Sequence, residues 1–147
     1  MHFARTLLNS RISQLAFALT FLIPIANADW PMFRHDAERT GYTPELLTEK
    51  LTLQWAYHTA KPVPAWPRSS RKTFDFAHQP IAAGGMVWFG SSVDGAVHAL
   101  DAATGKRKWI FYTQSPIRFA PIFWKGKLFV GSDDGYLYCL NANTGKL

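Results

Sequence analysis

The chain contains two copies of one segment, and this internal repeat constrains the fold more than any other feature. The first copy runs from Pro80 to Lys106 and the second from Pro121 to Lys146. Matched residues are 41 positions apart in the first half of the copies and 40 apart in the second half. The identical pairs are Pro80 and Pro121, Ile81 and Ile122, Gly85 and Gly126, Gly90 and Gly131, Ser91 and Ser132, Gly95 and Gly135, Leu100 and Leu140, Thr104 and Thr144, Gly105 and Gly145, and Lys106 and Lys146. A period near 40 built from short strands is typical of β-propellers, in which each repeat forms one four-stranded blade.

Each copy alternates short β-rich stretches with tight turns. Asp94-Gly95 and Asp134-Gly135 are typical of hairpin turns, because glycine adopts positive φ at low cost. The strands expected are 87–90, 96–101 and 108–113 in the first copy, and 128–131 and 136–141 in the second. The predicted fold class is therefore all-β. We expect a β-propeller fragment of four-stranded antiparallel blades, about two blades plus a leading strand, preceded by a signal helix.

The leading strand is expected at residues 51–58. There Leu51, Leu53, Trp55 and Tyr57 alternate with more polar residues, and this period of two predicts a strand with one buried face. Residues 29–50 are broken by proline and glycine and predict an irregular N-terminal segment. The repeat domain is accordingly placed at residues 51–147.

Residues 1–28 have the three-part plan of a secretory signal peptide. A basic start is followed by an apolar run at residues 15–25 and by the small residues Ala26 and Ala28, which predict cleavage after Ala28. The apolar run is about half as long as the ~20 residues that a membrane-spanning helix needs. We expect export to the periplasm or beyond the cell, with no stable membrane span after removal of the signal. An uncleaved N-terminal anchor is the alternative.

A short motif recurs at the end of each copy. Its pattern in the first copy is A-x-D-x-x-T-G-x-x-x-W, formed by Ala99, Asp101, Thr104, Gly105 and Trp109. The second copy keeps it in part, as Asn141, Thr144 and Gly145. This motif resembles the signature of PQQ-like, or quinoprotein-type, β-propeller repeats, and the segment from Asp29 to Pro44 resembles the start of exported bacterial members. Because closed propellers have about four to eight blades, the resemblance predicts that this chain is an N-terminal fragment.

The resemblance also implies structural roles for these residues. In such repeats the tryptophan packs between neighbouring blades, and the aspartate and Thr-Gly segment brace it. We therefore expect Trp109 to be largely buried against the second unit. We also expect Cys139, which aligns with Ala99, to be buried and unreactive.

The remaining residue patterns contain no recognisable catalytic, cofactor-binding or metal site. The single cysteine excludes an internal disulfide and a multi-thiolate metal centre. Asp133-Asp134-Gly135 is expected to be a turn rather than a calcium loop, and His98 a surface or rim residue rather than a ligand. The formal charge of +6 is scattered, and neither a basic stripe nor a nucleic-acid-binding motif accompanies it, so no nucleic-acid partner is expected.

Two functions remain open from the sequence. The first is a non-catalytic extracytoplasmic propeller scaffold that contacts other proteins, a ligand or the remainder of the propeller, similar to the propeller lipoprotein of outer-membrane protein assembly. The second is the N-terminal fragment of a PQQ-dependent dehydrogenase. The resemblance gives those enzymes a vicinal cysteine pair, a tryptophan beneath the quinone, and glutamate, asparagine and aspartate ligands to calcium. PQQ and calcium are expected only under the second hypothesis.

Overall fold

The computed structural model describes residues 29–47, 49–59 and 78–147. The predicted signal peptide, residues 1–28 with cleavage expected after Ala28 in the Ala26–Ala28 pattern, lies outside these residues. Within the described part, no helix is long and apolar enough to cross a membrane. The described secondary structure consists entirely of strands, which confirms the all-β prediction.

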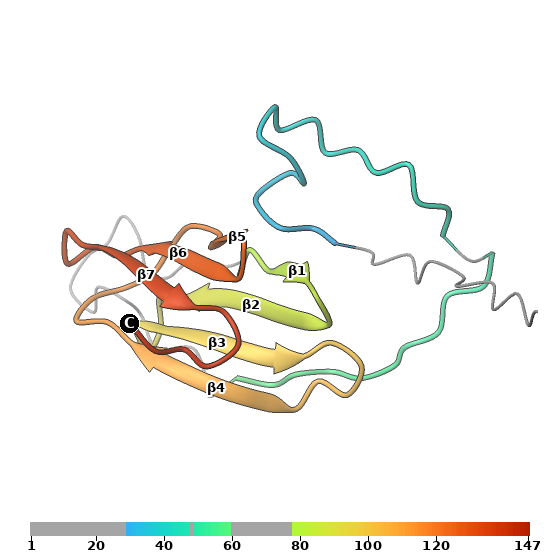
Figure 1. Cartoon of the computed structure of the whole chain (residues 1–147). Helices are drawn as coiled ribbons and strands as arrows, with labels where there is room; N and C mark the ends of the chain where they lie inside the picture. Colours follow the sequence, from blue (N-terminus) through green and yellow to red (C-terminus); the bar gives the residue numbers. More distant parts are fainter. Residues whose placement is uncertain (1–28, 48, 60–77) are drawn as a thin grey trace, which may run out of the picture.

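Two antiparallel sheets form the body of the molecule (Figure 1). The first has the strand order β1-β2-β3-β4 and the second the order β5-β6-β7. Their bounds are β1 Ile81–Ala83, β2 Met86–Ser91, β3 Ala96–Asp101, β4 Arg107–Tyr112, β5 Ile122–Trp124, β6 Lys127–Gly131 and β7 Leu137–Asn141. In both sheets each strand pairs with the next strand in sequence, because glycine turns at positive φ reverse the chain at Gly95 and Gly135.

Equivalent residues of the two copies occupy equivalent positions in the two sheets. In the first sheet Ile81 pairs with Trp88, Trp88 with Ala99, and Ala99 with Trp109. In the second sheet Ile122 pairs with Phe129 and Phe129 with Cys139. The sequence repeat is therefore a repeat of strand register as well as of residue type.

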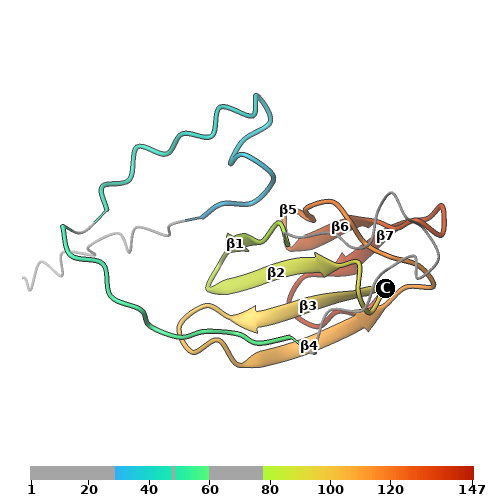
Figure 2. The ribbon, with the colours of Figure 1, turned by 180° about the vertical axis from the view of Figure 1, so that it is seen from behind.

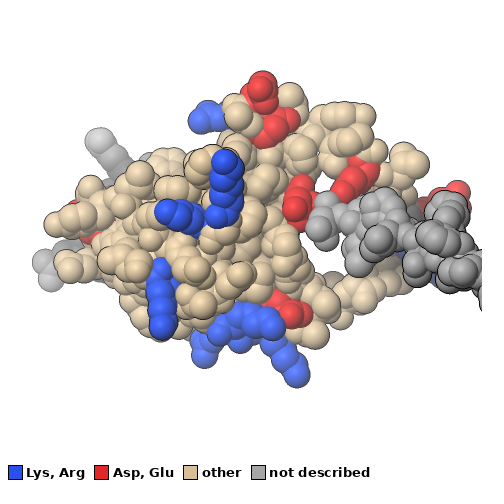
Figure 3. Space-filling model, in the orientation of Figure 1, with Lys and Arg blue, Asp and Glu red and all other residues tan. Residues whose placement is uncertain are grey.

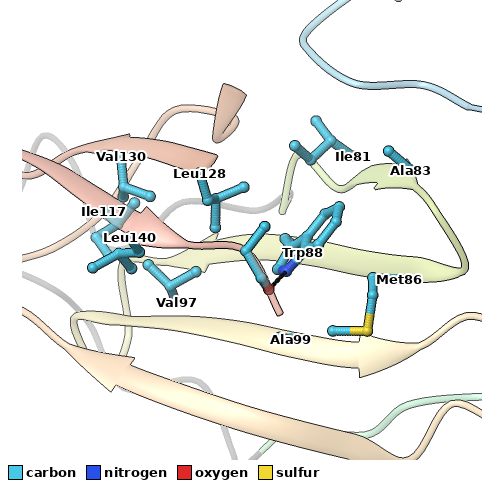
Figure 4. Close-up of a cluster of buried hydrophobic side chains, with 11 residues drawn as sticks. Ile81, Ala83, Met86, Trp88, Val97, Ala99, Ile117, Leu128, Val130 and Leu140 are labelled. Carbon is cyan, nitrogen blue, oxygen red and sulfur yellow. Dashed lines mark hydrogen bonds between the residues drawn. The ribbon is translucent and has the colours of Figure 1, made fainter. Parts of the chain in front are cut away.

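The core lies between the two sheets, which stack face to face (Figures 1 and 2). Trp88, Val97 and Ala99 of the first sheet meet Leu128, Val130 and Leu140 of the second (Figure 4). Trp88 also stacks on Phe123, with ring centroids 5.2 Å apart and an interplanar angle of 12°. Since alternate side chains of a strand point to opposite faces, the period-two pattern of each copy places these apolar residues on the shared face.

The N-terminal segment contacts one edge strand of each sheet, β1 and β5. Trp30 exchanges two backbone hydrogen bonds with Ala82 of β1. The carbonyl oxygen of the next residue, Pro31, accepts a hydrogen bond from the backbone N–H of Phe123 in β5 at 2.8 Å. Residues 30 and 31 therefore connect the two sheets through backbone atoms alone.

The leading strand expected at residues 51–58 is not paired into a sheet. The segment is extended beside the first sheet, but it has no strand assignment, and Leu51 and Leu53 are exposed. No described strand lies along its backbone to exchange ladder hydrogen bonds with it, so the expected buried face is limited to the half-buried Trp55 and Tyr57. The prediction of a buried strand was wrong in this respect.

Candidate functional site: tryptophan docking between the sheets

The two copies of the repeat motif form the same small loop. The Oδ1 atom of Asp101 accepts hydrogen bonds from the backbone N–H and the hydroxyl of Thr104, at 2.9 and 2.8 Å. In the second copy Asn141 Oδ1 accepts the same two bonds from Thr144, at 3.0 and 3.1 Å. An amide oxygen replaces a carboxylate oxygen without changing the loop, because both are acceptors with free lone pairs.

The motif aspartate carries a perturbed pKa. The hydroxyl of Thr104, the ammonium of Lys108 and the backbone N–H of Thr104 hold the pKa of Asp101 below its ordinary value. Lys108 Nζ lies 3.2 Å from Asp101 Oδ2. The carboxylate is thus held in its charged form, which is the form that accepts these bonds.

The motif tryptophan of the first sheet packs directly against the motif glycine of the second loop. A Cβ atom on Gly145 would lie 2.7 Å from the indole ring of Trp109. The indole Nε1 of Trp109 donates to the carbonyl oxygen of Ala142 at 3.0 Å. Trp109 is half-buried and packs against the core cluster, so it sits at the junction of the two sheets. Ala99, its partner across the strands, is fully buried.

A second tryptophan makes the same contact one repeat earlier. A Cβ atom on Gly105 would lie 2.6 Å from the ring of Trp55, and Trp55 Nε1 donates to Ala102 O at 2.9 Å. Ala102 and Gly105 are the equivalents of Ala142 and Gly145. Trp55 therefore stands to the first sheet as Trp109 stands to the second.

The sequence analysis did not assign this role to Trp55. The signal was present: Trp55, Tyr57 and Thr59 have the spacing of Trp109, Phe111 and Thr113. The structure extends the match, since Tyr57 meets His98 edge-on at 6.1 Å and Phe111 meets the equivalent Tyr138 edge-on at 5.4 Å. The equivalence of Trp55 and Trp109 is hard to see in the sequence, because the two residues are further apart than the two copies of the repeat.

Cys139 is exposed, which corrects the prediction that it is buried. Its equivalent Ala99 lies on a face that the second sheet covers. The corresponding face of the second sheet, which carries Cys139 and the exposed Leu137, has no covering layer among the described residues. The alignment gave the correct position in the strand, but burial depends on the neighbouring sheet.

His98 is buried, which corrects the prediction of a surface or rim position. Its Nε2 lies 2.9 Å from Asp94 Oδ2, and its Nδ1 lies 3.4 Å from the Tyr57 hydroxyl. Tyr138 takes the equivalent position in the second sheet and donates to Asp134 Oδ2 at 2.8 Å. Each hairpin therefore has a polar ring that reaches back to its turn aspartate.

The turn aspartates act as acceptors within the turns. Burial acts to raise the pKa of Asp134, but hydrogen bonds from the Tyr136 N–H, the Tyr138 hydroxyl and the Gln114 N–H hold it below its ordinary value. The same contact with Asp134 raises the pKa of Tyr138. Asp133 pairs with Arg118, so both carboxylates of this turn have protein partners.

A pocket of about 620 Å³ lies between the N-terminal segment and the start of β5. Its walls include Phe33, Phe119 and Ile122, and Asp36 is its carboxylate. Both Asp36 oxygens accept hydrogen bonds from Thr40, and the Thr40 hydroxyl is the main cause that lowers the pKa of Asp36. A calcium ion needs about six to eight oxygen ligands, and the described ranges contain no group of three or more His, Cys, Asp or Glu residues placed to hold a metal ion. The residues that line this pocket supply one carboxylate, Asp36, and do not fit a calcium ion.

Fold and docking geometry together define a propeller repeat protein whose stacked blades are joined by tryptophan–glycine contacts. Residues 30–147 match the family model described as the β-propeller domain of glucose, ethanol and alcohol dehydrogenases of the PQQ type. The chain belongs to this PQQ β-propeller family.

Individual known proteins resemble the chain over limited parts of their own length. It is 29% identical over 129 residues to a quinohemoprotein alcohol dehydrogenase of Comamonas testosteroni, which covers 80% of this chain and 17% of that protein. A europium-containing methanol dehydrogenase superposes with a TM-score of 0.52 at 24% identity, over 65% of this chain and 18% of its own. BamB from Moraxella catarrhalis gives a TM-score of 0.40 at 27% identity, over 43% of this chain and 19% of its own. The chain thus spans less than a fifth of each of these proteins.

Proposed function

We propose that residues 29–147 act as a non-catalytic, extracytoplasmic propeller segment that holds blades together and presents a surface for protein contact. The observation that carries the proposal is the tryptophan contact made twice, by Trp55 on Gly105 and by Trp109 on Gly145. In both contacts the indole N–H donates to a carbonyl oxygen of the motif loop, so these polar groups serve to hold the tryptophan in place. The signal-like residues 1–28 support an extracytoplasmic location.

The pocket beside β5 supports the same function. Phe33, Phe119 and Ile122 are exposed apolar side chains at its wall, and exposed apolar groups of this kind are common at sites of protein contact. Its carboxylate, Asp36, is already engaged by Thr40 and is poorly placed to bind a cation or move a proton.

The second candidate is the N-terminal blades of a PQQ-dependent alcohol dehydrogenase. The observation that favours it is the relationship to the quinohemoprotein alcohol dehydrogenase of Comamonas testosteroni over 80% of this chain. Under this hypothesis the present residues still serve as blades, and the quinone contacts come from residues outside 29–147.

Calorimetry tests whether this chain is non-catalytic by itself. The folded full chain is titrated with the quinone in the presence of calcium, and alcohol oxidation is followed with an artificial electron acceptor. We expect neither saturable binding nor turnover. Saturable one-to-one binding in the micromolar range, or calcium-dependent turnover, would overturn the scaffold proposal. As an independent measure, peptides of the native protein that extend past Leu147 and contain a vicinal cysteine pair would favour the enzyme.

A further inference from the structure

Residues 51–58 attach to the first sheet through side chains. They form no backbone hydrogen bond with the described strands. The indole of Trp55 packs on the loop at Gly105, and the hydroxyl of Tyr57 lies 3.4 Å from Nδ1 of His98. A segment held by few contacts opens more easily than a strand paired in a sheet, so a change in one contact shifts its attachment.

The hydrogen-bond partners of His98 decide which ring nitrogen carries the hydrogen. Its Nε2 lies 2.9 Å from Asp94 Oδ2. An ionised carboxylate can only accept hydrogen bonds, so Nε2 is the nitrogen that donates. In a neutral imidazole the other nitrogen is an acceptor, so the Tyr57 hydroxyl donates to Nδ1. The bond from Tyr57 therefore requires the neutral form of the ring.

The two partners of His98 differ in whether they depend on the attachment of residues 51–58. Asp94 belongs to the same hairpin as His98 and stays beside it in the attached and the detached state. Tyr57 reaches His98 only in the attached state. It also helps to bury the His98 side chain, which is 5% exposed, and burial disfavours a charged imidazole. Attachment therefore favours the neutral ring.

The strands on both sides of His98 place apolar side chains against its ring. Phe89 of β2 stacks on it, with ring centroids 4.8 Å apart and an interplanar angle of 3°. Ile110 of β4 lies directly opposite, and Tyr112, the next residue on that face of β4, is 64% exposed. Phe89 also contacts the ring of the exposed His78, at 5.0 Å. Within the described ranges, Asp94 and Tyr57 are thus the titratable groups in contact with the ring.

The second sheet has the same arrangement without a histidine. Tyr138 takes the place of His98 and donates to Asp134 Oδ2 at 2.8 Å, and Phe111 takes the place of Tyr57. The contact with Asp134 raises the pKa of Tyr138 above its ordinary value of 10.0, so the hydroxyl keeps its proton near neutral pH. Neither ring of this second pair changes charge in the range in which a histidine titrates.

Histidine is the side chain that responds to mild acid. Figure 3 shows Lys, Arg, Asp and Glu side chains in separate groups on one face of the molecule. Side chains of these four types keep their charge between about pH 5.5 and 8, whereas a histidine changes charge near pH ~6.5. The described part of the chain contains His35, His58, His78 and His98. Of these, His98 joins residues 51–58 to the first sheet.

We propose that His98, Asp94 and Tyr57 form a pH-sensitive latch, which holds residues 51–58 on the first sheet at neutral pH and loosens in mild acid. When a proton binds to Nδ1, this nitrogen no longer accepts the bond from Tyr57, and the attached state must bury a charged ring. The detached state therefore binds the proton more readily, so attachment weakens as the pH falls through the range in which histidine titrates. The latch goes beyond the proposed function, because it makes the contact of Trp55 with Gly105 depend on pH.

Exchange of two indole hydrogens with solvent, followed by NMR in the full chain, tests the proposal. Trp55 Nε1–H is bonded to Ala102 O and Trp109 Nε1–H to the equivalent Ala142 O, so Trp109 corrects for the intrinsic pH dependence of exchange. We expect the ratio of the Trp55 rate to the Trp109 rate to rise roughly threefold to tenfold from about pH 8 to about pH 5.5, the effect of one lost hydrogen bond. A ratio that is independent of pH would overturn the proposal.

The second copy of the repeat supplies a variant that removes the titrating group. His98→Tyr copies Tyr138 and keeps a donor for Asp94, so the ratio of exchange rates should no longer change with pH. His58→Gln is the matched control, since His58 is exposed on the same segment, and it should keep the response of the parent protein. A response that persists in His98→Tyr, or that disappears in His58→Gln, would assign the proton to another histidine and overturn the proposal.

Tyr57→Phe copies Phe111 and removes one oxygen atom, so it gives a test that does not depend on the folding of His98→Tyr. Circular dichroism and a thermal melt establish that each variant is folded. In Tyr57→Phe the ratio at about pH 8 should already be close to the value of the parent protein in acid, and its rise toward acid should be smaller. A Tyr57→Phe variant with the full pH response of the parent would contradict the latch.

Discussion

Trp88 and Trp109 donate their indole N–H groups to the same acceptor, the carbonyl oxygen of Ala142, at 3.1 and 3.0 Å. The two side chains come from β2 and β4, so the first sheet holds the loop of the second from two strands. A carbonyl oxygen has two lone pairs and can accept both bonds. In the second copy Phe129 replaces Trp88, so only the motif tryptophan contact has an equivalent elsewhere in the described chain.

The first prediction separates two contributions of Trp109 to stability, the packing of its ring and the hydrogen bond of its indole N–H. Trp109→Phe should lower the free energy of unfolding by about 1 kcal/mol, the typical worth of one hydrogen bond, because Trp88 still satisfies Ala142 O. Trp109→Ala should cost about 3 kcal/mol, since it also leaves a cavity over Gly145. Urea unfolding measures both. Tyr112→Ala, an exposed position on the same strand, is the control and should change stability by less than about 0.5 kcal/mol.

The second prediction concerns Gly145, against which the indole of Trp109 packs. Gly145 and Gly135 both have positive φ, of 69° and 87°, but nothing lies within 4 Å of a Cβ on Gly135. Both Gly→Ala changes should therefore cost about 1–2 kcal/mol from backbone strain. Gly145→Ala should cost roughly 1–3 kcal/mol more, because its methyl group meets Trp109.

A double-mutant cycle tests the origin of that difference. In a Trp109→Ala background the extra cost of Gly145→Ala should largely disappear, because the clashing ring is gone. Equal costs at Gly135 and Gly145 in the parent protein would contradict the docking contact.

The third prediction compares two positions that the repeat makes equivalent. Ala99→Ser places a hydroxyl in the fully buried core and should lower the free energy of unfolding by about 1–3 kcal/mol. Cys139→Ser should change it by less than about 0.5 kcal/mol because Cys139 is exposed. Thermal melts of the two variants measure the difference. Similar losses in both would mean that the face of the second sheet is covered after all.

The fourth prediction uses the depressed pKa of Asp101. Because the folded pKa lies below the ordinary value of 3.8, the carboxylate contributes stability above that pH. This contribution is lost as the pH falls from about 3.8 through the folded pKa. Asp101→Asn mimics Asn141, so it should keep the Thr104 bonds and remove this part of the acid dependence. The measurement is the urea midpoint as a function of pH.

Asp101→Ala is the control for the loop itself. It removes both the charge and the acceptor, so the midpoint should fall at neutral pH as well as in acid. An Asp101→Asn variant that keeps the full acid dependence of the parent would assign that dependence to other carboxylates, such as Asp134.

Local structure could be predicted well from the sequence because each strand and turn of one copy has an equivalent in the other copy. The expected strand at 96–101 coincides with β3, and those at 108–113 and 136–141 differ from β4 and β7 by one residue. The Asp-Gly turns needed no tertiary information, since glycine at positive φ decides them. The motif loops likewise depend on hydrogen bonds between near neighbours in sequence.

The errors concern properties that a neighbouring element decides. Cys139 and Ala99 have equivalent places in their strands. Another sheet covers Ala99, whereas no described residues cover Cys139 in the same way. His98 alternates like a surface residue, yet Tyr57, which is distant in sequence, lies against its ring. Residues 51–58 have the alternation of a strand, but alternation alone does not supply a pairing partner. Burial and pairing therefore required the three-dimensional arrangement.

The backbone bridge made by residues 30 and 31 has a consequence for local opening of the molecule. Trp30 is hydrogen-bonded to β1 and Pro31 to β5, so these two edge strands cannot separate unless the N-terminal segment detaches from at least one of them. Amide hydrogens bonded across one unit exchange with solvent in the same opening event. The amides of Ala82 and Phe123, which belong to different sheets, are therefore both exposed only when this segment leaves both strands, and the bridge couples the opening of the two blades at β1 and β5.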